Sequence, residues 1–262
     1  MNYVLSLSYG KDSMACLGAI EVLGWPLDRI VTADEWATDT IPADLPPMED
    51  FKARADAEIK KRYGITVEHF CAKKDGKKVT YESAFYRRLS CGKREGEILG
   101  WPYLKGPWCN SELKMAALKV AQRSAKNAIW YVGIAVDEDK RFHVLNDKKR
   151  SPLIAVGWTE ADCRRWCAEN GLLSPTYDNF TRGGCWFCHN QGLNQLRQLR
   201  HDYPDLWQLM LKWDKDSPVR FKERHSLSEY DKRFCLEDEG LIQADEFFRW
   251  EMLNAELNYR LF

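Results

Sequence analysis

The sequence has no apolar run long enough to cross a bilayer. Such a crossing needs about 20 consecutive apolar residues, and every apolar stretch of these 262 residues is shorter. The N-terminus also lacks a basic segment followed by a long apolar one, so we expect no signal peptide. These absences favour a cytoplasmic protein without a membrane partner.

Neither sign of charge is in excess. Lys and Arg number 39, and Asp and Glu also number 39, so no global field draws the chain to nucleic acid or to an anionic membrane. A local basic patch is still compatible with this balance. The five histidines form no His-Glu-x-x-His or similar metal spacing, and a lone histidine is usually structural.

Two common nucleotide-binding motifs are missing. No Gly-x-Gly-x-x-Gly occurs, and Leu5 stands where a Walker A loop ending at Gly10 needs a glycine. Cysteine, by contrast, is plentiful. Nine cysteines without an export signal indicate a reducing compartment, where thiols serve as core residues, metal ligands or nucleophiles.

Strand-like and helix-like segments alternate through the first two thirds of the chain. The predicted strands are Tyr3–Leu7, Arg29–Ala33, Thr66–Cys71 and Ile129–Ile134. The predicted helices are Ser13–Leu23, one that starts at Pro46 and closes at Gly64, Ser111–Ala125 and Glu160–Glu169. This alternation predicts an α/β fold with a doubly wound, mainly parallel sheet.

The character of the chain changes after about Leu173. A Gly-rich turn with two cysteines is followed by segments rich in Trp, Leu, Lys and Arg, which predict helices over Leu193–Trp213 and Ala244–Leu257. We therefore predict one domain over residues 1–190 and a helical C-terminal extension over residues 191–262.

The segment Ser8–Ser13 joins the first strand to the first helix. Backbone N–H groups and the helix dipole favour an anion there, and Gly10 allows close backbone approach. Ser8 and Ser13 offer hydroxyl donors, Lys11 offers a cation, and Asp12 offers a metal-bridging oxygen or a helix cap. The alternative is an ordinary strand–helix turn with polar caps.

This hexapeptide resembles the Ser-Gly-Gly-x-Asp-Ser pyrophosphate loop of the N-type ATP pyrophosphatases, although Tyr9 replaces a glycine. That superfamily includes phosphoadenosine phosphosulfate (PAPS) reductases, tRNA thiolation enzymes and the DNA-phosphorothioation sulfurtransferase. Further segments are similar to theirs: Lys149–Leu153 with Trp158, Thr159 and Asp162; Leu173–Tyr177 with Gly184, Cys185 and Cys188; and Trp108–Lys114. The resemblance covers roughly residues 3–190, is strongest to reductase-like proteins often encoded by phages, and implies the adenine nucleotide alpha-hydrolase-like fold.

Cys185 and Cys188 have the spacing of a metal knuckle. A redox pair or two buried thiols would show the same spacing. The resemblance brings Cys109 to them as a third ligand, with His189 or Cys91 as the fourth or with the fourth position open. Thiolates suit a [4Fe-4S] cluster or, alternatively, Zn²⁺.

Other candidates follow the predicted strands. Asp34, Thr38 and Asp39 lie where related enzymes contact adenine and ribose, or they form a surface turn. The segment from Gly133 to Arg141 is similar to a phosphate-binding segment of the sulfurtransferases, in which Ala135 replaces an arginine. Lys149 and Arg150 suit phosphate, sulfate or a nucleic-acid backbone, whereas the lysines of residues 73–78 form a solvated loop.

Three functions compete. The first is an ATP-dependent enzyme that adenylates an acceptor and transfers sulfur, with Mg²⁺ as cofactor and Lys11, Asp12 and Arg141 as catalytic residues. Its partners would be an adenine nucleotide, a nucleic-acid or small-molecule acceptor and a sulfur-donor protein. Its nucleotide-binding residues would be Ser8, Tyr9, Gly10, Lys11, Asp12, Ser13, Asp34, Gly133, Lys149 and Arg150, and its metal ligands Cys109, Cys185, Cys188 and His189.

The second function is reduction of PAPS or adenosine phosphosulfate (APS). Those reductases use a cysteine in a C-terminal Glu-Cys-Gly-Leu-His tail, whereas this chain ends in Asn-Tyr-Arg-Leu-Phe and its last cysteine is Cys235. The third is a non-catalytic module that binds a nucleotide or a nucleic acid and holds a structural zinc.

Overall fold

The computed structural model describes residues 1–102, 107–179, 183–244, 247–250 and 253. The chain forms two compact units, and each is built from two chain segments. The first unit comprises Met1–Glu82 and Cys109–Trp186, and the second comprises Ser83–Trp108 and Phe187–Phe262. Residues 83–108, which the sequence assigns to the nucleotide-binding domain, therefore group with the C-terminal helices.

A five-stranded sheet forms the centre of the first unit. Its order is β3-β2-β1-β6-β7, and every neighbouring pair is parallel. The strands are β1 (Asn2–Ser6), β2 (Arg29–Ala33), β3 (Val67–Phe70), β6 (Ala128–Tyr131) and β7 (Lys149–Arg150). Leu5 on the central strand pairs with Ile30 on one side and with Tyr131 on the other. The predicted α/β class with a mainly parallel sheet is confirmed.

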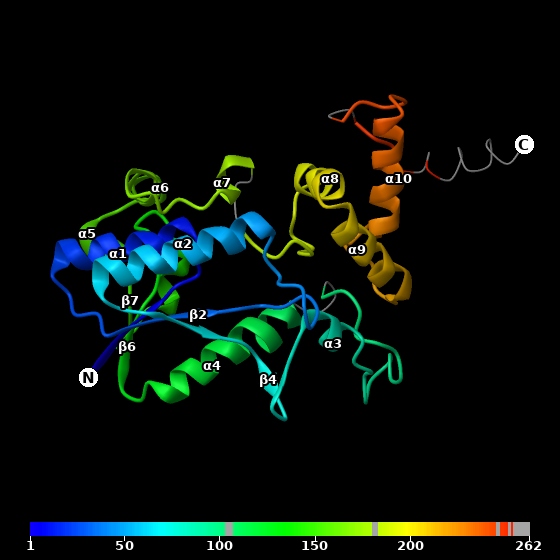
Figure 1. Ribbon diagram of the computed structural model, residues 1–262. Helices are drawn as coiled ribbons and strands as arrows, with labels where there is room; N and C mark the ends of the chain where they lie inside the picture. Colours follow the sequence, from blue (N-terminus) through cyan, green and yellow to red (C-terminus); the bar gives the residue numbers. More distant parts are fainter. Residues whose placement is uncertain (103–106, 180–182, 245–246, 251–252, 254–262) are drawn as a thin grey trace, which may run out of the picture. The chain divides into compact units, whose positions relative to one another are not determined.

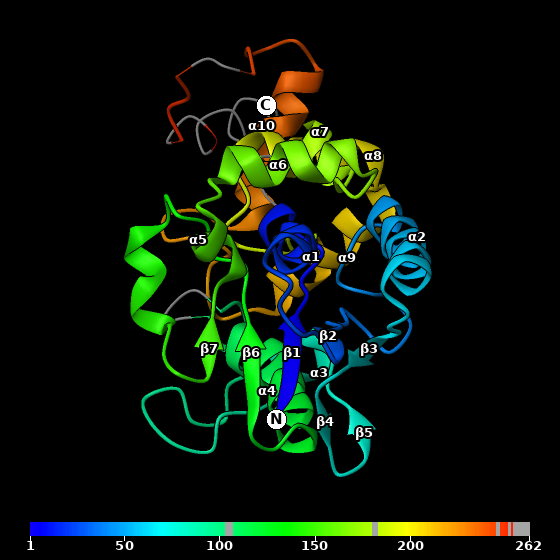
Figure 2. The ribbon, with the colours of Figure 1, turned by 90° about the vertical axis from the view of Figure 1, so that its left-hand side faces the viewer.

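Helices cover both faces of this sheet. In Figure 2, α1 (Lys11–Leu23), α2 (Pro46–Tyr63), α5 (Pro152–Val156) and α6 (Glu160–Glu169) lie above the sheet, and α4 (Met115–Ser124) lies below it. Helix α1 is buried along most of its length because α6 packs over it. A Cβ on Gly18 would lie only 2.2 Å from the Trp166 ring, so this close packing requires glycine.

Local sequence signals set the ends of these helices. Pro46 begins α2, and Gly24 and Gly64 end α1 and α2 in the left-handed conformation that glycine adopts readily. Helix α6 begins at the predicted residue, because Thr159 and Asp162 form a complete capping box.

The strand order reverses at β1. The chain runs outward from β1 through β2 to β3, and later fills the other side with β6 and β7. Adjacent crossovers that leave in opposite directions open a crevice at the carboxyl ends of the two central strands, where ligands of open α/β sheets bind. Here those strands are β1 and β6, and the segments that follow them are residues 7–10 and 132–138.

Shorter elements complete the first unit. They are the antiparallel hairpin of β4 (Lys73–Lys74) and β5 (Lys77–Lys78), a π-helix over Asn110–Lys114, a 3₁₀-helix over Asp139–Val144 and α7 (Thr176–Asn179). Helix α3 (Tyr81–Phe85) lies where the chain passes from one unit to the other. Figure 1 follows these elements along the chain.

The second unit consists of α8 (Leu193–Asp202), α9 (Pro204–Asp216), α10 (Leu227–Asp238) and the segment before Trp108. Its core is aromatic: Trp101 packs edge-on against Trp213 and Phe221. No helix in the described part of the chain combines the length and apolar character that a bilayer crossing requires.

Two helix predictions for this unit need correction. The single helix over Leu193–Trp213 is wrong, because the chain breaks at Tyr203 and α9 starts at Pro204, whose ring is tolerated only in a first turn. The predicted helix over Ala244–Leu257 falls largely outside the described residues, and residues 247–249 are not helical. Helix α10, which the sequence analysis missed, carries a capping box of Ser226 and Glu229.

Candidate functional site

The loop after β1 is held in a tight turn by its two serines. The Ser13 hydroxyl donates to the Gly10 carbonyl over 3.0 Å, accepts from the Ser8 backbone N–H over 3.1 Å and lies 3.0 Å from the Ser8 hydroxyl. Tyr9 adopts a positive φ of 55°. This conformation costs a non-glycine residue roughly 1–2 kcal/mol, so the surrounding contacts must compensate for it.

The N-terminus of α1 points its backbone donors into this turn. Gly10 is the N-cap and is extended, and the first intrahelical bond runs from Met14 N–H to the Gly10 carbonyl. The preceding N–H groups have no acceptor within the helix. The Lys11 N–H donates to the Tyr177 hydroxyl over 3.1 Å. A ligand with phosphoryl oxygens would find these donors and the positive end of the helix dipole together.

Lys11 lies between two carboxylates. Its ammonium is 2.8 Å from Asp12 Oδ1 and 3.1 Å from Glu160 Oε1, and its side chain is only 14% exposed. Burial alone would lower the pKa of Lys11, but the hydrogen bonds and charges of the two carboxylates raise it above its ordinary value. Burial raises the pKa of the Asp12 carboxyl, although Lys11 opposes that shift.

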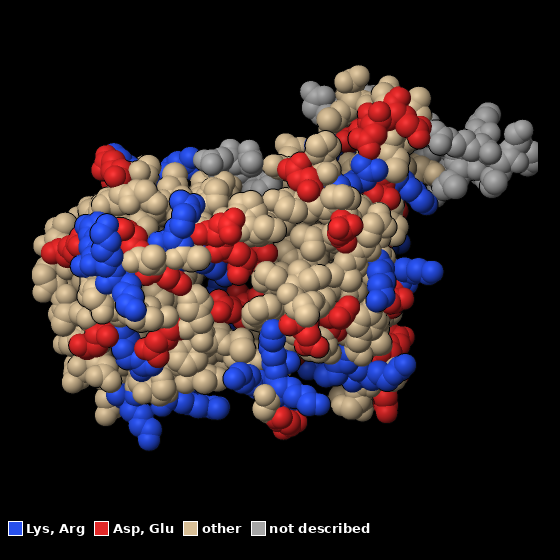
Figure 3. Space-filling model, in the orientation of Figure 1, with Lys and Arg blue, Asp and Glu red and all other residues tan. Residues whose placement is uncertain are grey.

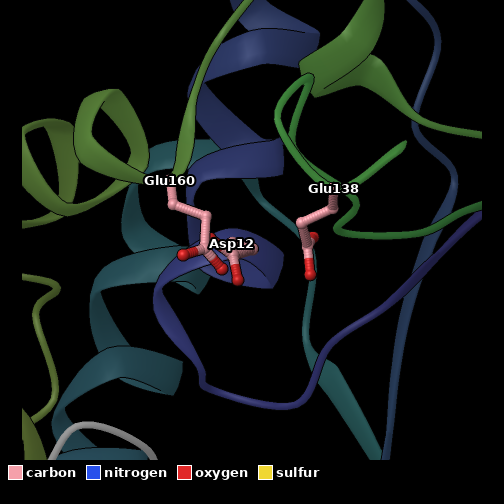
Figure 4. Close-up of side chains that lie close together, drawn as sticks. All are labelled: Asp12, Glu138 and Glu160. Carbon is pink, nitrogen blue, oxygen red and sulfur yellow. The ribbon is translucent and has the colours of Figure 1, made fainter. Parts of the chain in front are cut away.

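Asp12, Glu138 and Glu160 form the acidic cluster of the first unit. Their carboxylate oxygens lie within 4.8 Å of one another, and Figure 4 shows the three side chains converging from α1, from the segment after β6 and from the start of α6. Glu138 is itself held by the Ala135 N–H at 3.1 Å and by Arg141 at 2.7 Å. Three carboxylates at this separation offer oxygen ligands to a hard cation such as Mg²⁺.

Gly133 is the point where the segment after β6 meets the start of α1. A Cβ there would lie 2.6 Å from the Ser13 nitrogen and 2.7 Å from the Asp12 carbonyl carbon. These are backbone atoms that cannot rotate away, so only glycine fits. Gly133 therefore allows the segment that carries Glu138 to lie directly against the start of α1.

A second polar network begins at Tyr9, on the far side of the loop. The Tyr9 hydroxyl donates to Asp56 Oδ1 over 2.6 Å, and His69 bridges Asp56 Oδ2 and Asp34 Oδ2, with 2.9 Å to each. The hydrogen bonds to Asp34 and Asp56 raise the pKa of His69 to about 9, against the opposing effect of burial. His69 is therefore an imidazolium at neutral pH.

Lys52 joins the same network from α2. Its ammonium lies 2.6 Å from Asp44, 3.2 Å from Glu49 and 3.8 Å from Asp34. Burial would lower the pKa of Lys52, but the charge of Asp44 and the other carboxylates raises it instead. Two cations, Lys52 and His69, thus lie among four carboxylates beside the Ser8–Ser13 loop.

The predicted nucleotide-binding residues fall into two groups. Ser8, Tyr9, Gly10, Lys11, Asp12, Ser13 and Gly133 come together at the carboxyl ends of β1 and β6, and Asp34 lies in the Tyr9 network. Lys149 and Arg150 form β7 at the edge of the sheet, opposite Trp130 and Tyr131. Arg141 is half-exposed on the 3₁₀-helix, and it reaches the acidic cluster through its ion pair with Glu138.

Thr38 and Asp39 belong to the turn after β2. The Thr38 hydroxyl accepts from the Ile41 N–H over 3.0 Å, and the Asp39 carbonyl accepts from the Lys78 ammonium over 2.9 Å. Both contacts shape the turn itself, which is the role that the surface-turn interpretation gives these residues.

The predicted thiolate ligands are divided between the two units. Cys109 and Cys185 belong to the first unit, Cys188 and His189 belong to the second, and the three cysteines are all partly exposed. Cys91, the other fourth-ligand candidate, is exposed in the second unit. Cys16, Cys163 and Cys167 are buried beside α1, as expected of structural thiols, and Cys167 donates to the Lys11 carbonyl over 3.2 Å.

Sequence reasoning missed several residues of this site, and four of them show why. In the sequence, Glu160 is an ordinary first-turn residue of a capped helix. Tyr177 stands out only as the last residue of the segment Leu173–Tyr177. His69 is a lone histidine, for which the sequence predicts a structural role. Asp56 lies on a predicted helix and belongs to no motif. Each is identified only by partners that are distant in sequence.

Comparison of the chain with protein-family models, with curated proteins and with solved structures gave no match.

Proposed function

We propose that this chain is an adenine-nucleotide-binding enzyme of the PP-loop kind, with the adenine nucleotide alpha-hydrolase-like fold in its first unit. The observation that carries the proposal is the position of Lys11. It is a partly buried cation in the first turn of α1, beside a serine-braced turn and at the reversal point of a parallel sheet. A polyphosphate at this position would meet backbone donors, the helix dipole and the ammonium together.

The acidic cluster fits the Mg²⁺ ion that accompanies such a nucleotide. Asp12, Glu138 and Glu160 offer the hard oxygen ligands and the close spacing that this ion needs. Bound there, Mg²⁺ would neutralise charge on the polyphosphate. Lys11 would exchange its contacts with Asp12 and Glu160 for phosphoryl oxygens and so fix the orientation of the leaving group.

The reaction we propose is adenylation of an acceptor, followed by sulfur transfer. An acceptor oxygen attacks the α-phosphorus of ATP, the bond to the bridging oxygen breaks and pyrophosphate leaves from the Ser8–Ser13 loop. Lys11 stabilises the developing charge on pyrophosphate. Arg141, Lys149 and Arg150 supply further positive charge on the β6–β7 side of the loop. A hydrosulfide supplied by the sulfur donor then attacks the adenylated carbon, the bond from that carbon to the phosphate oxygen breaks, and AMP leaves.

The sulfur chemistry would belong to the cysteines. We propose for them the occupant that the sequence resemblance implies, a [4Fe-4S] cluster, whose predicted ligands are Cys109, Cys185 and Cys188 with His189 or an open position as the fourth. Zinc is the alternative occupant for the same thiolates. Anaerobic purification followed by iron, zinc and acid-labile sulfide analysis distinguishes them.

The proposal is tested by titrating the protein with ATP and with PAPS in the presence of Mg²⁺. We expect micromolar or tighter binding, weakened about 10- to 100-fold by Lys11→Ala, the equivalent of a lost charge-assisted contact. Lys61→Ala is the matched control, because Lys61 is exposed and pairs only within α2, with Glu58. Equal affinity of the protein and its Lys11→Ala variant would refute the proposal. Release of sulfite rather than pyrophosphate would assign the reductase function instead.

A further inference from the structure

The hairpin after β3 presents a concentrated positive charge. Residues 73–78 contain four lysines and a single acidic residue, Asp75. Lys73 pairs with Lys78 and Lys74 pairs with Lys77 across the two strands. Like charges directly opposite each other destabilise a β-ladder, so these pairs do not contribute to holding the hairpin together.

The hairpin is nevertheless well defined by other contacts. Asp75 and Gly76 both have positive φ, of 51° and 77°, as a tight type I′ turn requires. At the base, the Val79 N–H donates to the Ala72 carbonyl over 2.8 Å. The Lys78 ammonium lies 3.3 Å from the centre of the Trp36 ring and donates to the Asp39 carbonyl. Lys78 thus anchors the hairpin, whereas Lys73, Lys74 and Lys77 are exposed.

Helix α4 continues the same positive surface. The chain from Leu113 to Asn127 contains Lys114, Lys119, Arg123 and Lys126, all exposed, and no acidic residue. The helix buries Ala117 and Ala121 and packs on β2 and β3, so its basic side faces outward. Lys119 and Arg123 are four residues apart, another unfavourable like-charge neighbour pair.

Both ribbon views place the hairpin beside α4 on one side of the first unit. Figure 3 shows Lys and Arg side chains gathered along this lower side. We call the exposed cations of the hairpin and of α4 the basic face; they are Lys73, Lys74, Lys77, Lys114, Lys119, Arg123 and Lys126. On a chain with no net charge, such a face is a local concentration of one sign.

We propose that the basic face binds the phosphate backbone of a nucleic acid. A row of phosphates matches a surface of several exposed cations, whose two segments, residues 73–78 and 113–127, contain Asp75 as their single acidic residue. It also relieves the repulsion within the lysine pairs. An anionic membrane is the competing partner, because α4 also exposes the apolar side chains of Met115 and Val120; the vesicle experiment below distinguishes the two. The proposal does not depend on the Ser8–Ser13 loop.

The test is fluorescence anisotropy with labelled duplex DNA, single-stranded DNA and RNA, between about 50 and 200 mM salt. We expect binding that weakens steeply with salt. The variant Lys74→Ala/Lys77→Ala should weaken binding and reduce the magnitude of the slope of log K against log salt by about 2, since each phosphate contact contributes about 0.9. Lys119→Ala/Arg123→Ala should have a similar effect.

The matched control is Lys60→Ala/Lys61→Ala, which removes two exposed charges from α2, on the opposite face of the sheet. This control should keep its affinity to within twofold and its full salt slope. The hairpin variant removes a repulsive pair, so its melting temperature should not fall, and this separates lost binding from lost folding.

Three outcomes overturn the proposal: no binding of any of the three nucleic acids at low salt, equal loss in the α2 control, or binding of phosphatidylserine vesicles in preference to nucleic acid. If the Lys11→Ala variant binds nucleic acid as tightly as the wild type does, the basic face acts independently of the Ser8–Ser13 loop. A protein that does not bind ATP could still bind nucleic acid through the basic face. The experiments therefore test the proposed nucleotide site and the proposed nucleic-acid surface separately.

Discussion

The hydroxyl of Tyr9 donates a 2.6 Å hydrogen bond to Asp56, a residue 47 positions away on α2. Tyr9 is the residue of the Ser8–Ser13 loop with positive φ. The bond therefore ties a strained backbone position to a helix on the same face of the sheet. A glycine at position 9 would avoid the strain, but it would also remove this link.

We expect Tyr9→Phe to lower the free energy of unfolding by about 1.5–3 kcal/mol, the contribution of a hydrogen bond to a charged group. Urea denaturation measures this change. Tyr3→Phe is the control, since the ring that stacks on Tyr131 is retained. If Tyr9→Phe unfolds at the same urea concentration as the wild type, the Asp56 contact does not support the loop.

His69 should make stability depend on pH in the alkaline range. Its pKa is raised from 6.5 to about 9 in the folded state, so its contribution is complete below about pH 6.5 and is lost as the pH rises through 9. We expect a loss of about 1–2 kcal/mol over this range, reduced from the full shift because the side chain is partly exposed.

The measurement is the free energy of unfolding of the wild type and of His69→Asn at several pH values from 6 to 10. The difference between the two proteins should shrink as the pH rises. A constant difference would mean that the protonated ring is not what Asp34 and Asp56 stabilise.

Gly133→Ala should disturb the Ser8–Ser13 loop and the start of α1 directly. The added methyl group would lie 2.6 Å from the Ser13 nitrogen, and overpacking of this kind typically costs about 1–3 kcal/mol. Nucleotide affinity should fall as well, since the start of α1 must move. Gly184→Ala is the control, because a Cβ at Gly184 meets nothing within 4 Å. Equal thermal unfolding of the two variants would contradict this prediction.

Glu160→Gln should weaken the metal-dependent part of nucleotide binding. One of three carboxylates in the acidic cluster loses its charge, and we expect the apparent Mg²⁺ affinity, measured in the presence of ATP, to fall about tenfold, roughly 1.4 kcal/mol. Glu169→Gln, at the exposed end of the same helix, is the control. Should both variants need the same Mg²⁺ concentration, Glu160 is not a ligand.

Thr159→Ala removes the cap that starts α6. The Thr159 hydroxyl accepts from the Asp162 N–H, and the Asp162 carboxylate accepts from the Thr159 N–H in return. Loss of such a cap costs about 1 kcal/mol. We expect this loss in urea denaturation, with a further decrease in Mg²⁺ affinity because Glu160 is the first residue of the helix. A stable variant with unchanged Mg²⁺ affinity would show that the cap does not position Glu160.

Local signals in the sequence account for much of the first unit. Arg29–Ala33 and Glu160–Glu169 have the bounds that alternation and the capping box predict, because each depends on neighbours within a few residues. The turn between the first strand and the first helix is where the sequence predicts it for the same reason. Its serines, Gly10 and Lys11 all fall within the short segment Ser8–Ser13, between a patterned strand and a patterned helix.

The residues that sequence reasoning missed depend on contacts over long separations. His69 becomes a charged bridge only because β3 brings it to Asp34 after β2 and to Asp56 on α2. Glu160 reaches Lys11 only because α6 packs on α1. In the second unit, the apolar pattern of Leu193–Trp213 continued across Tyr203, and the signal that ended the helix was Pro204. The capping box of α10 was a local signal that was available and was overlooked.

The division of the second unit into two chain segments determines the order in which the polypeptide can fold during its synthesis. Trp101 leaves the ribosome more than one hundred residues before Trp213 and Phe221, the rings against which it packs. Until Trp213 and Phe221 have been synthesised, residues 83–108 lack the partners with which they form a core. The sheet, in contrast, can already form once β6 and β7 have been synthesised. A nascent chain stalled before α9 would thus carry a completed sheet and an aromatic segment exposed to chaperones.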